Sequence, residues 1–250
     1  LWTALGGCRR EPAAAPESGV DPRRSEWIRV LLFGNLNECT LRIPGRVRMV
    51  CPGQNAVVEY PCESCELLVS IRDGTIRIAE YEFQDRVELE IAEPARFEIE
   101  GLAFRGHLDL IPDPDGRTFS AVNRVLLEEY LLGVIGAEMQ SYWEPEALRA
   151  QAVASRTYCL FIRQRFGDSR DYDLRRTQAH QMYRGIAAET GPTRQAVLDT
   201  QGQVLLCPDS EGEYRLFPTY FASCCGGRTD DSSMIFGDSY SALKGVECPY

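Results

Sequence analysis

The sequence lacks three features: a long apolar run, an excess of basic residues, and any internal repeat or long low-complexity tract. No run reaches the roughly 18 apolar residues of a membrane-spanning helix. The formal net charge of −10 disfavours nucleic acid and anionic membrane surfaces as partners, because binding to phosphates requires clustered Lys and Arg. It also disfavours acidic polymers, so a neutral polymer such as a sugar strand stays open as a partner.

The composition is that of a globular protein with many cysteines. Apolar residues make up 44% of the 250 residues, which is enough to fill the core of one large domain or two small ones. Four of the ten cysteines, Cys39, Cys51, Cys62 and Cys65, fall in one short stretch. Disulfides formed outside the cytoplasm and a metal site would both account for them.

The first 25 residues predict the remnant of an export signal followed by a tether. The chain begins with Leu1 and not with Met, so we expect its start to be missing. Leu5-Gly6-Gly7-Cys8 is typical of the end of a bacterial lipoprotein signal, in which the cysteine becomes lipidated. Residues 9–25 are too polar and too rich in Pro and Ala to fold alone. We predict an exported protein of the cell envelope, attached to the membrane only through Cys8; a chance cysteine in a frayed terminus is the alternative.

Residues 26–120 are predicted to form a strand-rich part, arranged as a meander of short antiparallel strands. Residues 27–33, 86–91, 96–99, 106–111 and 117–122 are rich in β-forming residues or alternate between polar and apolar. Residues 67–72 and 75–78 flank Asp73-Gly74, a dipeptide typical of tight hairpin turns.

Residues 121–250 are predicted to form the catalytic core, with two main helices. Apolar residues recur at helical spacing after Asn123, a plausible N-cap, and the helix should end near Gly136. Pro145 suits the start of a second helix that extends to about Arg165. Residues 193–199 predict a short helix capped by Thr190 or Thr193, and residues 203–207 and 214–220 predict a hairpin. The fold class is therefore α+β, with two helices and a closing β-hairpin that form a cleft.

Four ordered blocks carry a resemblance to a known family. Leu126–Met139 contains Leu-Glu-Glu-Tyr-Leu-Leu-Gly-Val and ends in Glu138-Met139, and residues 148–158 read Leu-Arg-Ala-Gln-Ala-Val-Ala-Ser-Arg-Thr-Tyr. Residues 181–185 read Gln-Met-Tyr-Arg-Gly and residues 223–229 read Ser-Cys-Cys-Gly-Gly-Arg-Thr. Together these blocks resemble the stage II sporulation protein D and amidase-enhancer family (SpoIID/LytB). The match is specific from about residue 102 onward.

The resemblance implies a function in the cell wall. Relatives cleave the glycan strands of peptidoglycan as lytic transglycosylases, or stimulate an amidase that removes the peptides. It also implies that Glu138 is the catalytic acid and base. A transglycosylase can work with one carboxyl group and no cofactor, because the 6-hydroxyl of the sugar attacks in place of water. A non-catalytic enhancer or binding module for an amidase is the alternative.

Other residues are candidates for contacts with the glycan. Gln151 and Tyr158 are seven positions apart on one helix face, and Gln181 and Tyr183 belong to the third block. Arg156 lies in the middle of an apolar helix face, where it needs an anionic partner or an exposed head group. The further candidates Ser223, Gly226 and Gly227 belong to the fourth block, where glycine lets the backbone approach a ligand closely or simply forms a tight turn. Packing contacts are the alternative for all of these side chains.

A structural zinc site is a further possibility in the second half. His180, Cys225 and Cys248 offer three ligands, and Cys224 is adjacent. Some relatives carry zinc near this cleft, but Arg175, Arg176 and Ala179 stand where those relatives have Cys, Asp and His. Disulfides or buried thiols are the alternative. His107 alternates out of an apolar strand and is expected to be structural, and Cys159 and Cys207 are expected in the core.

Overall fold

The computed structural model describes residues 27–61 and 64–248, and it has the predicted α+β class. Twelve strands come first: β1 Trp27–Leu36, β2 Glu38–Ile43, β3 Val47–Cys51, β4 Ala56–Tyr60, β5 Cys65–Arg72, β6 Thr75–Ile78, β7 Tyr81–Phe83, β8 Val87–Ile91, β9 Arg96–Ile99, β10 Leu102–Arg105, β11 His107–Pro112 and β12 Phe119–Leu126. The helices are α1 Leu127–Glu138, α2 Pro145–Phe166, α3 Gly191–Asp199 and α4 Ser232–Ile235. Three further strands are short: β13 Leu174–Arg175, β14 Cys207–Pro208 and β15 Tyr214–Arg215.

The strands form two sheets that share one apolar core. One sheet has the order β13-β1-β12-β11-β8-β3-β4, and the other has the order β10-β9-β2-β5-β6-β7. Buried and exposed residues alternate along β2, β3 and β8, so each sheet turns one face inward. The expected meander is therefore wrong in its connectivity, because β1 pairs with β12 and β2 pairs with β5 and β9. Alternation reveals which face is buried but not which strands are neighbours.

The predicted local signals for the strands are largely confirmed. β6 and β9 have the predicted bounds, and Asp73 and Gly74 both have positive φ angles, 50° and 77°, as the turn between β5 and β6 requires. His107 is structural, because its Nδ1 accepts a hydrogen bond from the backbone N–H of Ile91. Its ring also stacks on Trp27 at 5.2 Å between centroids.

The predicted start of the first helix is wrong. Asn123 lies inside β12, fully buried, and its side-chain amide donates to the carbonyl oxygens of Arg105 and His107. Pairing with both β1 and β11 keeps this segment extended up to Leu126, the N-cap residue of α1. The later elements follow the sequence signals more closely: α2 starts at Pro145, and Thr190 caps α3 through a reciprocal bond with Thr193.

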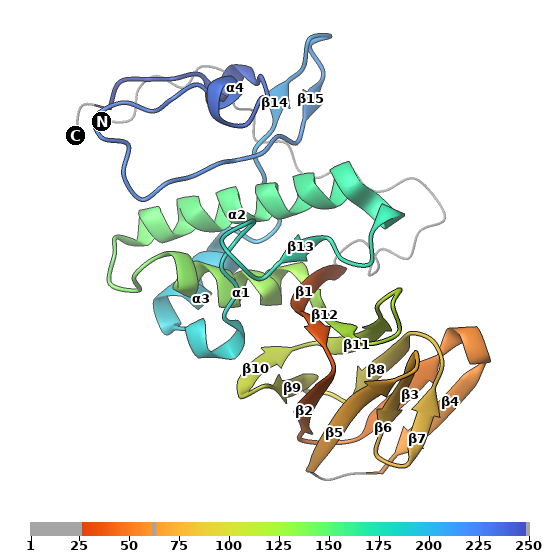
Figure 1. Ribbon diagram of the computed structural model, residues 1–250. Coiled ribbons are helices and arrows are strands. Elements are labelled where there is room, and N and C mark those ends of the chain that lie inside the picture. The colour runs from red at the N-terminus through yellow and green to blue at the C-terminus, as the bar shows by residue number, and fades with distance from the viewer. Residues whose placement is uncertain (1–26, 62–63, 249–250) are drawn as a thin grey trace.

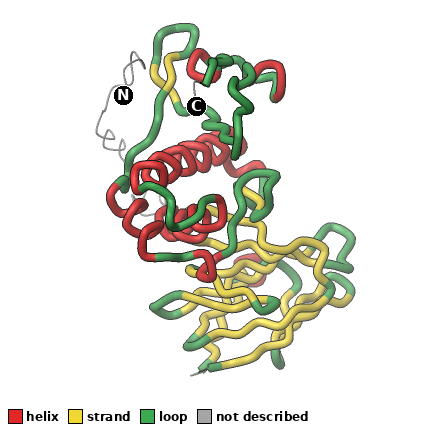
Figure 2. The backbone as a smooth tube through the Cα atoms, turned by 90° about the vertical axis from the view of Figure 1, so that its left-hand side faces the viewer, coloured by secondary structure: helices red, strands yellow, loops and turns green. Residues whose placement is uncertain are grey.

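Helices α1 and α2 lie between the sheets and the C-terminal part of the chain (Figures 1 and 2). We call residues 207–248 the C-terminal segment; it holds the predicted hairpin, reduced to two residues in each strand, and α4. Figure 1 shows this segment on the side of α2 that faces away from the sheets. Cys159 and Cys207 are buried, as predicted. Within the described residues no helix has the length and apolar character needed to cross a membrane.

Candidate functional site

Glu138 is the last residue of α1, and its carboxylate is held in a defined position. The helix continues two residues beyond the predicted end at Gly136, and Met139 is extended. One carboxylate oxygen, Oε1, accepts a hydrogen bond of 2.6 Å from the backbone N–H of Met182. The side chain is half-buried. In the hydrogen bonding of the described residues, Oε2 takes no part, so this oxygen remains available to a ligand.

Glycines allow the segment that holds Glu138 to pack directly on α1. A Cβ atom at Gly136 would overlap the carbonyl oxygen of Ala188, and one at Gly133 would overlap the ring of Tyr183. Gly185 has φ +63°, and a Cβ there would collide with the backbone of Ala103. Residues 181–188, which we call the strap, therefore approach α1 more closely than any larger side chain permits.

Buried polar contacts fix the strap from the other side. Gln181 is fully buried: its Oε1 accepts from the Tyr130 hydroxyl at 3.2 Å, and its Nε2 donates to the carbonyl oxygen of Ser155 at 3.3 Å. Tyr183 is also buried, and its hydroxyl donates to Oδ1 of Asn123 at 3.1 Å. Because these side chains are enclosed by protein, the prediction that Gln181 and Tyr183 contact the glycan is corrected. They orient the strap and, through the Met182 N–H, Glu138.

Arg156 is likewise structural. Its side chain is 1% exposed, and its Nε and Nη2 donate to the two carboxylate oxygens of Glu128 at 2.8 and 2.7 Å. The carbonyl oxygen of Gln203 accepts from Nη1 at 3.2 Å. The prediction of an anionic partner is confirmed, but that partner is internal, which corrects the assignment of Arg156 to glycan binding. A paired, buried guanidinium has no donor geometry left for a sugar at the surface.

The remaining candidates for glycan contacts differ in exposure. Tyr158 is 9% exposed and lies against the ring of Tyr220, so it also acts in packing, whereas half-buried Gln151 donates to the Ser155 hydroxyl at 3.1 Å. The residues of the fourth block, Ser223, Gly226 and Gly227, are exposed in the C-terminal segment. Both glycines have positive φ, 63° and 94°, and nothing lies within 4 Å of a Cβ built on either. Contact of these exposed groups with a ligand stays a prediction.

The proposed zinc ligands are not gathered into one site. Among the described residues, no group of three or more His, Cys, Asp and Glu side chains is arranged to hold a metal ion. Nδ1 of His180 instead accepts from the backbone N–H of Arg175 at 3.2 Å. Zinc binding by His180, Cys225 and Cys248 stays a prediction, and it would require these side chains to move together. Cys8, the predicted lipidation site, lies outside the described residues.

The loop after Glu138 carries two exposed aromatic residues that the sequence reasoning did not single out. Tyr142 is 81% exposed and Trp143 is 44% exposed. Trp143 donates its backbone N–H to the carbonyl oxygen of Gln140, which folds the loop into a turn, and it lines a cavity of about 290 Å³ with Leu148 and Ala196. An exposed ring offers an apolar face beside a polar edge. In the sequence, the only sign of these residues is that two aromatic residues follow Glu138 closely. Their exposure could be known only from the fold.

The hairpin borders a cavity whose lining does not include Glu138. β14 and β15 border a cavity of about 790 Å³ whose third wall is formed by Phe161, Gln164 and Arg165 of α2. Ser155, which contacts the strap, precedes Phe161 by six residues, or about 9 Å along the helix axis. The part of α2 that contacts the strap beside Glu138 therefore differs from the part that lines the cavity.

Comparison with known proteins finds relatives of this part of the chain. The SpoIID family model, described as "Stage II sporulation protein", matches residues 115–206, which include Glu138, Arg156 and the strap. Stage II sporulation protein D of Bacillus subtilis is 30% identical over 146 residues, covering 52% of this chain and 40% of that protein. An uncharacterised protein of Brachyspira hyodysenteriae is 34% identical over 150 residues, covering 60% of this chain and 39% of that protein.

A third relative is the amidase enhancer of Bacillus subtilis, which is 34% identical over 113 residues; these cover 45% of this chain and 14% of that protein. The chain thus spans about two fifths or less of the length of these relatives. The family model and the named relatives agree: residues 115–206 match the SpoIID family, and the chain is similar over part of its length to stage II sporulation protein D and to an amidase enhancer.

Proposed function

We propose that this protein acts in the cell envelope on the glycan strands of peptidoglycan, as a lytic transglycosylase with Glu138 as acid and base. The observation that carries the proposal is the placement of Glu138: a half-buried carboxyl group at a helix end, with one oxygen held by the Met182 N–H and the other unused. A glycosidic bond breaks when an acid protonates the leaving oxygen, and this requires a positioned carboxyl group with an accessible oxygen.

The proposed reaction uses Glu138 twice. The protonated carboxyl group first gives its proton to the bridging oxygen as the bond from the sugar C1 to that oxygen breaks. The resulting carboxylate then takes the proton of the 6-hydroxyl of the same sugar as its oxygen bonds to C1. The acid is thereby regenerated, the strand ends in an anhydro-sugar, and no water is consumed. We expect strands already free of peptides to be the preferred substrate, because an attached peptide would add bulk beside the bond that breaks.

The test is mass spectrometry of peptide-free glycan strands incubated with the protein. The wild type should create anhydro-sugar ends, and Glu138→Gln should lower the rate by about 10²–10⁴-fold, the usual contribution of a general acid. The Gln side chain keeps an oxygen that can accept from Met182, so the strap should stay in place. Glu144→Gln, at an exposed position of the next loop, is the matched control and should keep full activity. Absence of anhydro ends with the wild type, or full activity of Glu138→Gln, would reject the proposal.

The similarity to an amidase enhancer favours a second candidate function, in which the domain binds a cell-wall amidase or its substrate and raises the activity of that partner. In that case stimulation of a purified amidase should survive Glu138→Gln. Attachment to the membrane through a lipid on Cys8 also stays a proposal, and mass spectrometry of the protein isolated from membranes would detect the modification.

A further inference from the structure

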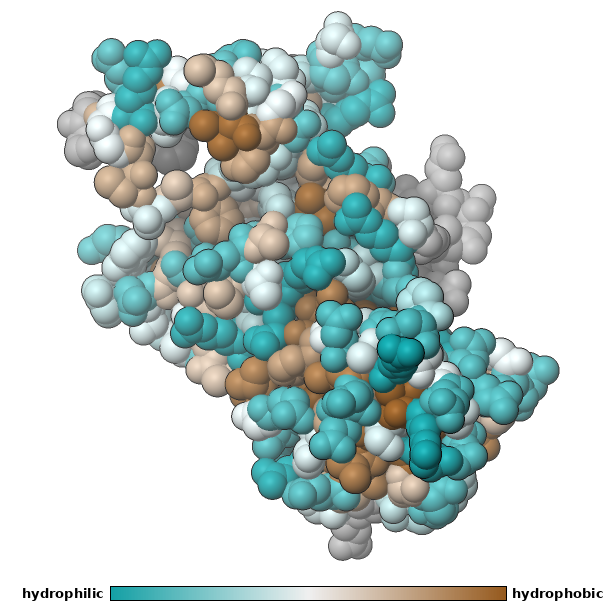
Figure 3. Space-filling model, viewed as in Figure 1, coloured by the Kyte–Doolittle hydropathy of each residue, from teal (hydrophilic) through white to brown (hydrophobic). Residues whose placement is uncertain are grey.

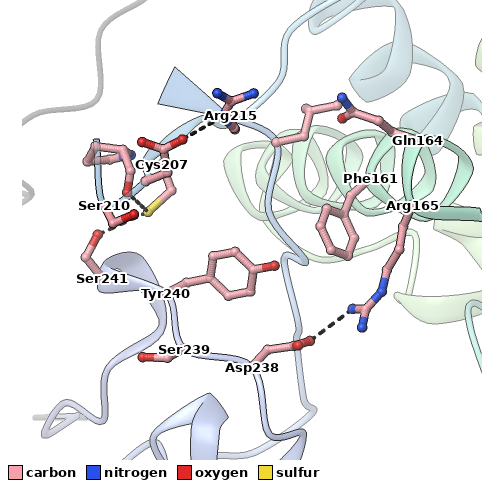
Figure 4. Close-up of a pocket in the computed structure, with 13 residues that line it drawn as sticks. Phe161, Gln164, Arg165, Cys207, Ser210, Arg215, Asp238, Ser239, Tyr240 and Ser241 are labelled. Carbon is pink, nitrogen blue, oxygen red and sulfur yellow. Dashed lines mark hydrogen bonds and ion pairs between the residues drawn. The ribbon is translucent and has the colours of Figure 1, made fainter. Parts of the chain in front are cut away.

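A cavity lies between the C-terminal half of α2 and the C-terminal segment, and nothing in the proposed reaction uses it (Figure 4). Its volume of about 790 Å³ falls within the roughly 300–1,000 Å³ typical of sites for small ligands. α2, the β14–β15 hairpin and residues 238–241 supply its walls.

Two ion pairs flank the cavity. Nη1 of Arg165 lies 3.4 Å from a carboxylate oxygen of Asp238, and Nε of Arg215 lies 2.5 Å from one of Asp209. Figure 4 shows Arg215 on one side of the cavity, Arg165 and Asp238 on the other, and the ring of Tyr240 between them. The cavity thus presents two positive and two negative groups, an arrangement that matches a ligand bearing both charges better than one bearing a single charge.

A ligand can replace one partner in each of these ion pairs with little loss of stability. The arginine side chains are 48% and 63% exposed, so solvent already screens each pair and its contribution to stability is small. The buried pair of Arg156 with Glu128 is the opposite case, because opening it would leave an enclosed charge without a partner. Arg165 and Arg215 can therefore donate to an incoming carboxylate. Asp238, which also accepts from the Tyr220 hydroxyl, and Asp209, which also accepts from the backbone N–H groups of Glu211 and Glu213, can then accept from an ammonium group in place of the arginines.

The rest of the lining favours a peptide over a sugar. The ring of Tyr240 already contacts the rings of Phe161 and Phe217, with centroids 6.3 and 6.2 Å apart, so it is part of an internal aromatic cluster. Leu216 adds apolar surface suited to small aliphatic side chains. The amide of Gln164 and several serine hydroxyls can pair with peptide N–H and C=O groups.

We propose that this cavity binds a short zwitterionic peptide with free carboxylates, an amino group and small side chains. The peptide portion of peptidoglycan has this chemistry, and in naming that source the inference rests on the proposed cell-wall function. The site would let the protein respond to peptides of the polymer through one half of α2 while the other half supports Glu138.

Isothermal titration of the whole chain with the tripeptide alanyl-glutamyl-lysine tests the proposal, with N-acetyl-trialanine amide as the uncharged control peptide. The charged peptide should bind in the micromolar to millimolar range, and the uncharged one should not. Arg165→Gln and Arg215→Gln should each weaken binding about tenfold, as expected for loss of one charge-assisted hydrogen bond. Arg170→Gln, at an exposed arginine outside the lining, should leave it unchanged.

Glu138→Gln separates this inference from the proposed enzyme activity, because peptide binding should survive that substitution whether or not glycan is cleaved. Absence of binding at millimolar peptide, or binding that neither arginine substitution weakens, would overturn the inference. Binding of a tetramer of N-acetylglucosamine that is lost in the same two variants would overturn it as well and assign the cavity to the glycan.

Discussion

Residues 27–206, which we call the body, differ from the C-terminal segment in where polar and apolar groups lie. In the body, polar groups such as Asn123, Gln181 and Arg156 are enclosed and paired. In the C-terminal segment the consecutive residues Met234, Ile235 and Phe236 are exposed, and Figure 3 shows brown surface over α4 in the upper part of the view. Enclosed pairs fix one geometry, as a positioned acid requires, whereas exposed groups can exchange partners, as binding requires.

The largest expected effect comes from breaking the enclosed ion pair of the body. Arg156→Met should lower the free energy of unfolding by about 3 kcal/mol, because it removes the buried guanidinium that pairs with partly exposed Glu128 and donates to the carbonyl oxygen of Gln203. Urea denaturation measures this loss. Arg215→Met, in an ion pair of the C-terminal segment, is the control and should change stability little. Equal losses in the two variants would remove the distinction between the two regions.

Substitution of the tightest glycine should have the next largest effect. Gly136→Ala forces a Cβ atom into the backbone of Ala188 and should cost about 2 kcal/mol, after allowing for the better helix propensity of Ala. Gly191→Ala, where the added Cβ meets nothing within 4 Å, should be neutral in the same denaturation experiment. If Gly136→Ala folds with unchanged stability, the strap is less rigid than its packing indicates. The glycan assay would then show whether the variant still forms anhydro-sugar ends.

Acid should weaken the body first, since both histidines of the chain lie in it. Burial, and secondly Arg124, lower the pKa of His107 below its ordinary value of 6.5. The neutral imidazole is thus favoured in the folded state, and its contribution is complete above pH 6.5 and is lost as the pH falls below that value. The loss can reach about 1 kcal/mol, because a protonated Nδ1 cannot accept from Ile91.

The C-terminal segment should lose stability only at a lower pH than the body. Hydrogen bonds from Ser233 and a pairing with Lys244 lower the pKa of Asp231 to about 2. The contribution of Asp231 to stability is therefore present above its ordinary pKa of 3.8 and is lost as the pH falls towards 2.

The expectation for His107 is tested by measuring stability between pH 7 and 5, which should fall less in His107→Gln than in the wild type. An NMR titration in which His107 titrates at or above 6.5 would contradict the expectation.

The smallest effect is expected at the exposed apolar surface. Met234 is 81% exposed, so Met234→Ser should change the free energy of unfolding by no more than about 0.5 kcal/mol. Met49 is fully buried in β3, and the same substitution there should be strongly destabilising. A large loss at Met234 would show that α4 is covered by another part of the protein.

The sequence predicts elements whose signal is local. The Asp73-Gly74 turn, the start of α2 at Pro145 and the Thr190 cap depend on a few neighbouring residues, and all are confirmed. Asn123 was misjudged because strands distant in sequence hold it in a sheet, overriding its preference for a helix cap. β3, β4 and β10 were missed although β3 with β4 and β9 with β10 form local hairpins, because their turns at Pro52–Gln54 and Glu100-Gly101 lack the Asn-Gly or Asp-Gly signal.

Within the candidate site, the motif predicts Glu138 but not the roles of the residues around it. For Gln181, Tyr183 and Arg156, the sequence does not distinguish a side chain that faces a ligand from one that faces the interior. Only the packing of the folded protein decides between the two. The spacing of Gly133 and Gly136 was a readable sign of close approach along one face of α1, and it points to the strap. The exposure of Tyr142 and Trp143 has no local sign, because it depends on what the rest of the chain leaves uncovered.

The pairing of β1 with β13 has a consequence for synthesis of the protein. The backbone N–H and the guanidinium of Arg29 both bind Asp173, 144 residues later, and Val30 pairs with Leu174. At a translation rate of about 5–20 residues per second, this edge of β1 waits roughly 7–30 s for its partner. An open strand edge invites pairing with other chains. We therefore expect expression at lower temperature or with a holding chaperone to raise the soluble yield.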